Sequence, residues 1–416
     1  MQKSLSCEIL AVGTELLLGE IVNTDAQMLS QGLSELGISV FHHTVVGDNP
    51  QRLSEAVEIA KKRADIIITT GGLGPTADDL TKETIAKAFG KKLELHQPSL
   101  ERLYSRWSFG TMTKNNERQA WLPEGCEVLV NDWGTAPGCA FEAEGKHVIM
   151  LPGPQRECTA MWQYRAKPYL EKLTGGAIVS HFIRLYGIGE SAMEDKIAYI
   201  MDNAVNPSAA PYAKEGECLV RVTAKGETHE QAEEMTKPLI EQIVSELKDF
   251  VYGIDANSLE EVLVALLKEK KLTISTAESC TGGYISKRIT DIAGCSDVFM
   301  GGMVTYSNES KMKLLGVKAE TLEKYGAVSE QTAYEMASNV ARVMGTDIGV
   351  GITGIAGPGG GSEEKPVGLI YAGICYKGET KVYELPRRKN QSRERVRLLA
   401  SSKVLDLVRR TVLGIE

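Results

Sequence analysis

Two short runs in the last third of the chain carry hydroxyl and amino side chains at spacings that suit nucleophilic chemistry. TAESCTGG lies where a strand pattern gives way to a helix pattern, and VTYSNESK ends the next strand. All six histidines lie before residue 230, so a serine nucleophile here needs a lysine or a tyrosine as its proton acceptor. Ser279, Lys311 and Tyr306 are the candidates. The alternative is an ordinary helix cap beside a solvated lysine.

A glycine-rich turn, GGLGPTADDLT at residues 71–81, follows the buried strand pattern ADIIITT and precedes a helix. Such a turn presents backbone N–H groups and a helix N-terminus to an anion. It lacks both the Gly-Lys-Ser/Thr ending of a P-loop and the GxGxxG fingerprint. A helix cap explains one of the two aspartates, Asp78 or Asp79. Three glycines and a second aspartate favour a phosphate site at which Mg²⁺ bridges carboxylate and phosphate.

Similar turns follow other predicted strands of the first third: GTE at 13–15, NTD at 23–25, GDNP at 47–50 and LPGP at 151–154. Ligands of open α/β sheets bind beyond the carboxyl ends of the strands, so we expect these turns to converge there. In the last third, the glycine-rich loop 351–360 follows a buried strand and is expected to line a polar ligand. Arg393 and Arg397, near the start of the final helix, suit a phosphate group, although solvated arginines are more common.

Strand and helix patterns alternate through the first third and again after Ser258, which predicts mostly parallel sheets covered on both faces. The segment between them reads as a small α+β domain. A chain of 416 residues exceeds one comfortable core. We therefore expect domains at 1–170, 171–254 and 255–416, the last opening on a helix capped by Ser258.

The composition narrows the possible function classes. With 43% hydrophobic and 25% charged residues, the chain is typical of a soluble globular protein. Its net charge of −8 and the absence of a GxxG clamp in the middle segment argue against a nucleic-acid partner. No apolar run is long enough to span a membrane and no leader pattern opens the chain, so we expect a cytoplasmic protein. Eight scattered cysteines without a CxxC pair argue against zinc or disulfides.

Five motifs in order over residues 5–165 resemble the molybdopterin-binding MoaB/MogA-like fold, and more closely the N-terminal domain of the CinA proteins. They are GTELLLGEIVNTDAQ, VVGDNP, GGLGPTADDLT, GTAPG and LPGPQRE. The resemblance implies a three-layer α/β domain with metal-dependent ADP-ribose pyrophosphatase activity that yields AMP and ribose 5-phosphate. It also implies a site formed by Gly71, Gly72, Gly74, Asp48 and Asp79, with Mg²⁺ or a similar ion at the two aspartates.

Residues 258–412 resemble the CinA C-terminal domain through ESCTGG, VTYSNESK, GAVSEQTA, ITGIAGPGGGSEEKPVG and SRERVR. This α/β/α domain is a nicotinamide mononucleotide (NMN) amidohydrolase, so the resemblance implies hydrolysis of NMN to nicotinate mononucleotide and ammonia without a cofactor. It implies that Ser279 is the nucleophile and that Lys311 and Tyr306 handle its proton. It also implies that Thr353 lies near the amide and that Arg393 contacts the phosphate. The remaining expected substrate contacts are Thr281, Gly282, Gly283 and Gly354. A homodimer is also expected.

The sequence thus predicts a two-headed enzyme that recycles the NAD breakdown products NMN and ADP-ribose. Two alternatives from other classes stay open. In the first, the N-terminal domain is a non-catalytic pterin- or nucleotide-binding module with a regulatory role. In the second, the protein is a competence-associated partner protein.

Overall fold

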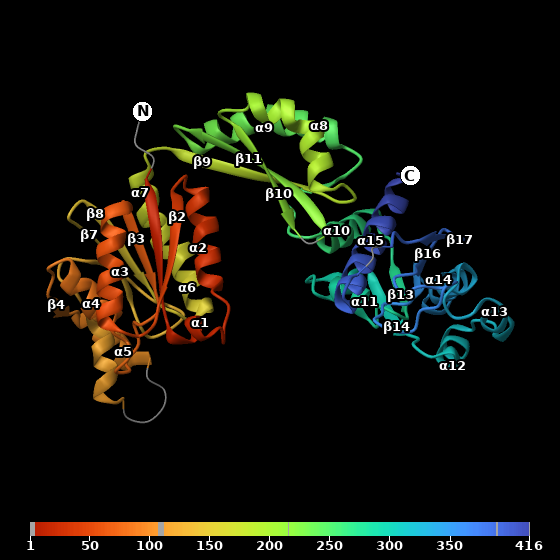
Figure 1. The fold of residues 1–416 in the computed structure, drawn as a ribbon, viewed down its shortest axis with the longest axis horizontal. Coiled ribbons are helices and arrows are strands. Elements are labelled where there is room, and N and C mark those ends of the chain that lie inside the picture. The colour runs from red at the N-terminus through yellow and green to blue at the C-terminus, as the bar shows by residue number, and fades with distance from the viewer. Residues whose placement is uncertain (1–4, 107–111, 215, 388–389, 416) are drawn as a thin grey trace. The chain divides into compact units, whose positions relative to one another are not determined.

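The structure, a computed structural model, describes residues 5–106, 112–214, 216–387 and 390–415 (Figure 1). The chain divides into two compact units. One comprises Met1–Ser180 with Thr223–Lys237, and the other comprises His181–Val222 with Pro238–Glu416.

The first unit is built on a six-stranded sheet in the order β2-β1-β3-β8-β7-β6. Its strands are β1 (Ser6–Val12), β2 (Ser39–Val46), β3 (Ile66–Thr70), β6 (Glu127–Leu129), β7 (Gly138–Ala143) and β8 (Lys146–Leu151). The first four strands in that order run parallel, while β7 and β6 pair antiparallel at one edge. A small separate sheet joins β4 (Leu93–Leu95) to β5 (Trp121–Pro123). The prediction of a mostly parallel sheet is confirmed.

Helices cover both faces of this sheet, as the continuous apolar runs predict. Helices α2 (Thr24–Glu35), α6 (Gln155–Met161), η2 (Trp162–Ala166) and α7 (Lys167–Thr174) cover one face, and α3 (Pro50–Arg63) and α4 (Thr81–Ala88) cover the other. The unit also contains α1 (Thr14–Leu18), α5 (Gln97–Arg106) and η1 (Lys114–Ala120). In β3, Ile66 and Ile68 pack with α2, α6 and α7, whereas Ile67 packs with α3 and α4 on the opposite face. Alternate residues of one strand therefore fill two cores, and the three-layer α/β architecture is confirmed.

The turns after the parallel strands meet at one edge of the sheet. Gly13 N donates to Val46 O at 2.9 Å, and Gly71 N donates to Leu151 O at 3.1 Å. Gly71 has φ +89°, and a Cβ on it would lie 2.1 Å from Val12 O, so only glycine fits. Because β1 lies between β2 and β3, the chain reverses its winding direction beside β1, where open α/β sheets bind ligands.

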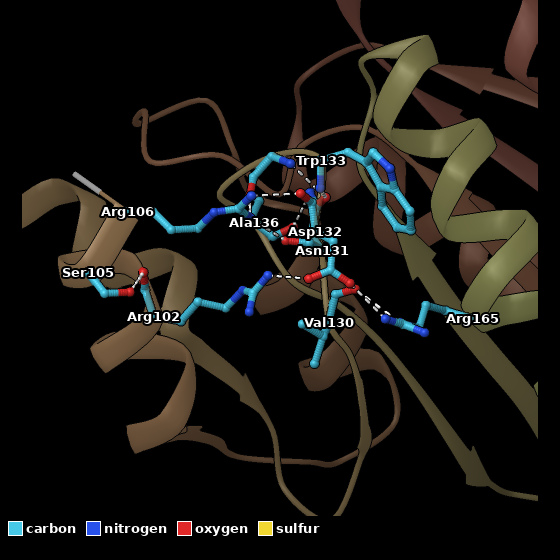
Figure 2. A network of polar contacts seen from close by, with 10 residues as sticks. Arg102, Ser105, Arg106, Val130, Asn131, Asp132, Trp133, Ala136 and Arg165 are labelled. Atoms are coloured by element: carbon cyan, nitrogen blue, oxygen red, sulfur yellow. Dashed lines mark hydrogen bonds and ion pairs between the residues drawn. The ribbon is translucent and has the colours of Figure 1, made fainter. Parts of the chain in front are cut away.

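The GTAPG motif is fixed at the same edge by a network of arginines (Figure 2). Arg102 and Arg165 both pair with the carboxylate of Asp132, and Arg106 donates to backbone carbonyls of residues 131, 132 and 134. The side chain of Asn131 donates to Ala136 O and to a carboxylate of α6. The loop that enters β7 is therefore held at several points before GTAPG begins.

A four-stranded sheet of order β10-β11-β9-β12 forms the middle segment. Its elements are β9 (Ala177–Leu185), α8 (Glu190–Asn203), β10 (Ser208–Lys214), β11 (Glu217–Gly226), α9 (His229–Leu247) and β12 (Val251–Ile254). Leu185, Ile197 and Val220 belong to one core cluster to which α9 also contributes, so both helices pack on the same face of the sheet (Figure 1).

The C-terminal segment has a five-stranded sheet of order β14-β13-β15-β16-β17. Its strands are β13 (Ile274–Glu278), β14 (Phe299–Val304), β15 (Ile348–Gly354), β16 (Ile370–Tyr376) and β17 (Glu379–Glu384). The helical elements are α10 (Leu259–Lys270), α11 (Tyr284–Thr290), η3 (Cys295–Asp297), α12 (Asn308–Ser310), η4 (Lys311–Leu315), α13 (Ala319–Tyr325), α14 (Glu330–Met344) and α15 (Arg393–Leu413). Strand β13 is parallel to both neighbours, and β16 and β17 complete the sheet antiparallel.

Helices enclose this sheet on two sides. Leu267 of α10 and Val404 of α15 pack in one cluster, and Met336 and Val340 of α14 pack in another. The predicted helix start is confirmed, because the side chain of Ser258 accepts from Glu261 N. The result is the expected α/β/α arrangement.

Candidate functional site

Ser279 and Lys311 meet at the carboxyl end of β13. Lys311 Nζ donates to Ser279 Oγ at 3.0 Å and to Thr305 O at 2.8 Å. Ser279 N donates to Ile352 O at 3.0 Å, which continues the pairing of β13 with β15 by one residue. Only 1% of Lys311 is exposed. The two candidates, 32 residues apart in the chain, therefore form a direct side-chain contact.

The surroundings favour a neutral amine and a neutral thiol at this point. Burial lowers the pKa of the Lys311 ammonium, because desolvation disfavours its charged form. Burial also raises the pKa of the neighbouring Cys280 to about 12, so this thiol stays protonated near neutral pH. Ser279, with an amine against its hydroxyl, is the better nucleophile of the two.

Glu278 is a site residue that the sequence analysis missed. It is fully buried, and its carboxylate accepts from Gly283 N at 3.0 Å, Ile285 N at 3.1 Å and Ser286 N at 2.8 Å. The Ser286 hydroxyl donates a fourth hydrogen bond, of 2.7 Å. A carboxylate ahead of a helix N-terminus is stabilised by that helix, but the same sequence pattern also fits a solvated side chain, so the sequence held no distinguishing signal.

The backbone N–H groups of Gly282 and Gly283, two of the expected substrate contacts, already have acceptors within the protein. Gly282 N donates to Ser279 O, and Gly283 N donates to Glu278. Both glycines adopt left-handed conformations, with φ +60° and +91°, which explains the residue type. Their contribution lies in the shape of the turn, because their N–H groups already have acceptors.

Two threonine hydroxyls beside the serine and the lysine have no partner within the described part of the chain. They are Thr281 Oγ1 and Thr305 Oγ1, and both residues are fully buried. The carbonyl of Thr281 is occupied, since Arg397 Nη2 donates to it at 2.6 Å. A buried hydroxyl without a partner is costly, so these oxygens mark places where a ligand or water would bond.

Tyr306 and Arg393 lie together at the exposed side of the site. Arg393 Nη2 donates to Tyr306 Oη at 3.0 Å, and Arg393 Nη1 donates to Gly357 O at 2.8 Å. Lys311 approaches the carbonyl of Tyr306 at 3.4 Å, not its hydroxyl. The structure thus joins the hydroxyl of Tyr306 to Arg393, whereas the sequence pairs it with Lys311.

Thr353 and Gly354 complete the set of residues from the C-terminal segment. Thr353 Oγ1 donates to Ala327 O at 2.6 Å, so the hydroxyl offers lone pairs to a ligand and no proton. A Cβ on Gly354 would lie 2.6 Å from Ile370 Cγ1, and one on Gly351 would lie 2.4 Å from Ala337 N. Close packing against β16 and α14 therefore explains both glycines.

The predicted aspartates of the N-terminal site are each tied to a threonine. Asp48 Oδ2 accepts from Thr14 N at 2.9 Å and from Thr14 Oγ1 at 2.7 Å. Asp79 Oδ2 accepts from Thr76 N at 2.8 Å and also from the Thr76 hydroxyl. Asp79 thereby closes the glycine turn, and a Cβ on Gly74 would lie 2.6 Å from its carboxylate.

Gly72, the remaining predicted turn residue, has φ +66° and lies against Thr81, whose hydroxyl donates to Gly71 O at 2.9 Å. The bonds of Asp48 and Asp79 to their threonines use Oδ2, and the described part of the chain holds no group of three or more His, Cys, Asp or Glu suited to a metal ion. Mg²⁺ commonly takes one or two carboxylates and completes its sphere with phosphate and water. Asp48 and Asp79 would be the carboxylates available to an ion that arrives with a phosphorylated substrate.

Three family models match successive parts of the chain. They are the probable molybdopterin binding domain over residues 8–172, the damage-inducible protein CinA KH domain over 180–253 and the CinA C-terminal domain over 256–412. A CinA-like protein of Kosmotoga olearia is 51% identical over 98% of this chain and 99% of its own length. The chain belongs to the CinA family. A putative competence-damage inducible protein of Clostridium acetobutylicum is 50% identical over 99% of this chain and all of its own length.

Solved CinA structures also resemble parts of this family member. The competence/damage inducible protein of Agrobacterium tumefaciens is 40% identical over 37% of this chain and 93% of that chain, with a TM-score of 0.36. A CinA structure from Thermoplasma acidophilum is 32% identical over 41% of this chain and 98% of that chain, with a TM-score of 0.38.

Among the described residues, no helix is both long and apolar enough to cross a membrane.

The match to a KH model gives the middle segment, expected only as a small α+β domain, a more specific description. The expectation that the protein has no nucleic-acid partner stays a prediction.

Proposed function

We propose that the C-terminal domain of this CinA-family protein hydrolyses the carboxamide of NMN to nicotinate mononucleotide and ammonia. The observation that carries the proposal is the 3.0 Å contact between Lys311 Nζ and Ser279 Oγ in a segment without histidine. A buried amine with a lowered pKa can accept the proton of a serine hydroxyl at a pH where an exposed lysine stays charged.

In this mechanism Ser279 Oγ attacks the amide carbon while its proton passes to the neutral Lys311. Collapse of the tetrahedral species breaks the C–N bond, and Lys311 returns the proton to the departing nitrogen, which leaves as ammonia. Water then attacks the acyl-serine while one of its protons passes to Lys311; the bond from the acyl carbon to Ser279 Oγ breaks, and Lys311 returns that proton to Ser279 Oγ as the carboxylate product leaves. Both steps need the lysine uncharged at their start, which its burial supports.

The surrounding side chains supply orientation. Thr353 Oγ1 donates to Ala327 O and offers lone pairs, which suits an amide N–H of the substrate. Arg393 lies at the exposed side with Tyr306, and a planar guanidinium suits the phosphate of the nucleotide. The unpartnered hydroxyl of Thr281 is available for the carbonyl oxygen or for a water.

We propose further that the N-terminal domain cleaves the pyrophosphate of ADP-ribose. The turn at 71–74 and the convergence of loops beside β1 support a phosphate site. Asp48 and Asp79 would hold a divalent metal, which would neutralise charge on the phosphates. The threonines that bond both carboxylates fix their orientation.

One observation favours a second candidate for this domain. Within the described residues no cluster of three metal-ligating side chains accompanies the glycine turn. A nucleotide-binding module without catalysis needs the glycine turn but no metal ion, so a non-catalytic N-terminal domain is the second candidate.

The deciding experiment incubates purified protein with NMN and, separately, with ADP-ribose, with Mg²⁺ and with EDTA, and separates the products by chromatography. We expect nicotinate mononucleotide in both conditions and AMP only with Mg²⁺. Asp79→Asn should lower AMP formation by about a hundredfold or more and leave deamidation unchanged. Binding of ADP-ribose without any AMP would favour the non-catalytic module.

A further inference from the structure

The 71–79 turn contains two aspartates and no lysine or arginine, so its side chains carry only negative charge. Asp78 and Asp79 lie on it, and Glu83 opens the following helix. A diphosphate brought to this turn meets like charge, which costs binding energy unless cations are close. The structure places one cation, Arg118, against the turn, and a second, Lys82, against the segment that carries Arg118; the sequence motifs indicated neither.

Lys82 is almost completely buried, with 2% of its surface exposed. Its Nζ donates to Arg118 O at 2.9 Å and to Gln119 O at 3.0 Å, so the ammonium fastens the end of η1 beneath α4. Burial lowers the pKa of this lysine to about 8. A lysine committed to two carbonyls in the interior acts on the turn through the segment that it holds.

That segment directs Arg118 back onto the glycine turn. Arg118 Nη1 donates to Thr76 O at 2.9 Å, and Nη2 pairs with Glu83 Oε1 at 3.0 Å. Thr76 is the residue whose N–H and hydroxyl hold the carboxylate of Asp79. The guanidinium therefore contacts the same turn residue that orients the predicted metal ligand.

Arg118 also retains capacity for a ligand. A guanidinium has five N–H donors, and the hydrogen bonds recorded among the described residues use two of them. Its side chain is 37% exposed, so the unused edge is accessible. Next to it, Glu83 Oε2 is buried without a partner in the described part of the chain. A guanidinium held in place with free donors suits two-pronged recognition of phosphate.

We propose that Arg118 is a substrate-binding residue of the N-terminal site, which contacts a diphosphate held at the 71–79 turn, and that Lys82 is the positioning residue that holds it there. The inference rests on the proposed phosphate site of this domain, and it does not require that the domain cleave its ligand.

The test titrates inorganic pyrophosphate into the full chain by calorimetry, with Mg²⁺ present and with excess nicotinate mononucleotide to occupy the C-terminal site. Arg118→Gln should weaken pyrophosphate binding at least tenfold. Arg118→Lys should have an affinity between those of the wild type and Arg118→Gln, because lysine keeps the positive charge but lacks the two-pronged guanidinium. The matched control is Arg63→Gln. Arg63 is 36% exposed and pairs with Glu8 at 2.6 Å near the other end of β1, so its loss should change pyrophosphate affinity less than twofold.

Lys82→Met tests the positioning role. It should weaken pyrophosphate binding in the wild-type background, whereas adding it to Arg118→Gln should weaken binding no further, because its effect passes through Arg118. A purely structural lysine would lower the melting temperature of both backgrounds and leave pyrophosphate affinity unchanged.

The outcomes separate this inference from the proposed activity. If the wild type binds pyrophosphate and Arg118→Gln does not, the inference stands even where ADP-ribose is not cleaved. If Arg118→Gln binds within twofold of the wild type, or if the wild type binds no pyrophosphate, the inference is overturned.

Discussion

The two candidate sites differ in how their reactive groups are held. In the C-terminal segment, Ser279 and Lys311 touch directly through their side chains. In the N-terminal unit, Asp48 bonds to Thr14 of the neighbouring turn and Asp79 bonds to Thr76 of its own turn, so each carboxylate is anchored by a threonine. The first site is assembled before any ligand arrives, whereas the second would be completed by a phosphate and its metal. Preorganisation therefore predicts metal-free chemistry at one and ligand-dependent assembly at the other.

The most severe way to break this comparison is Ser279→Ala. Loss of the nucleophile should lower ammonia release from NMN by about three orders of magnitude or more, because the lysine then has no hydroxyl to activate. An enzyme-coupled ammonia assay measures the rate, and AMP formation from ADP-ribose in the same sample should not change. Cys280→Ala is the matched control and should keep most of the activity. Near-normal turnover in Ser279→Ala would reject the serine as nucleophile.

The next effect tests the protonation state of the assembled site. Deamidation needs neutral Lys311, so its rate should rise with pH and level off above a pKa that burial has moved below the ordinary lysine value. Lys311→Arg keeps a charge that cannot be removed and should lose activity by about a hundredfold or more at every pH. The measurement is kcat against pH from 6 to 10. A variant with arginine that retains the wild-type profile would contradict the role of general base.

A smaller effect is expected from Glu278→Gln, which probes how the serine turn is held. An amide retains one acceptor oxygen and turns an NH₂ group toward N–H donors, so part of the four-bond cap is lost. We expect kcat to fall about tenfold to a hundredfold with KM nearly constant, since the turn carries Ser279. Ser275→Ala serves as a control. Ser275 also lies on β13, but its hydroxyl forms a 2.7 Å hydrogen bond with the hydroxyl of Thr346 and does not contact the turn. Equal kcat in Glu278→Gln and the wild type would show that Glu278 stabilises the fold without affecting catalysis.

The smallest predicted effect concerns stability in the N-terminal unit. Burial raises the pKa of Asp25 to about 6, and its Oδ1 is buried without a partner in the described residues. The folded state thus holds this proton more tightly than the unfolded state, so stability falls as pH rises from about 4 to about 6. Asp25→Asn removes that dependence and should stabilise the unit by roughly 1–3 kcal/mol at pH 8 and by little at pH 4. Urea unfolding at pH 4 and pH 8 measures the free energy of unfolding of both proteins. Equal stabilisation by Asp25→Asn at both pH values would show that the raised pKa of Asp25 is not the cause.

Much of the fold followed from local patterns. The apolar run of β3 and the Ser258 cap each fix their own structure through neighbouring residues. The short strands β4, β5, β6, β7 and β10 were not anticipated, since pairing with distant partners stabilises them more than their own composition does. The predicted boundaries at 170 and 254 stay predictions.

The sites show the same division. Residue type and spacing indicated Ser279 and Lys311, because a histidine-free serine mechanism leaves few bases. Glu278 was missed because an acidic residue at a strand end has no pattern that distinguishes a buried cap from a solvated side chain. Arg118 was missed because it reaches Thr76 across 42 residues of sequence. Contacts of this kind depend on the packing of whole elements, which local spacing does not encode.

One measurement tests most directly whether the two sites differ as described. Purified full-length protein is treated with excess EDTA, and ammonia from NMN and AMP from ADP-ribose are followed in parallel before and after Mg²⁺ is restored. The preassembled C-terminal site predicts an unchanged deamidation rate throughout, while AMP formation stops with EDTA and returns with Mg²⁺. Loss of deamidation in EDTA that Mg²⁺ reverses would contradict the metal-free serine–lysine mechanism and with it the distinction between the two sites.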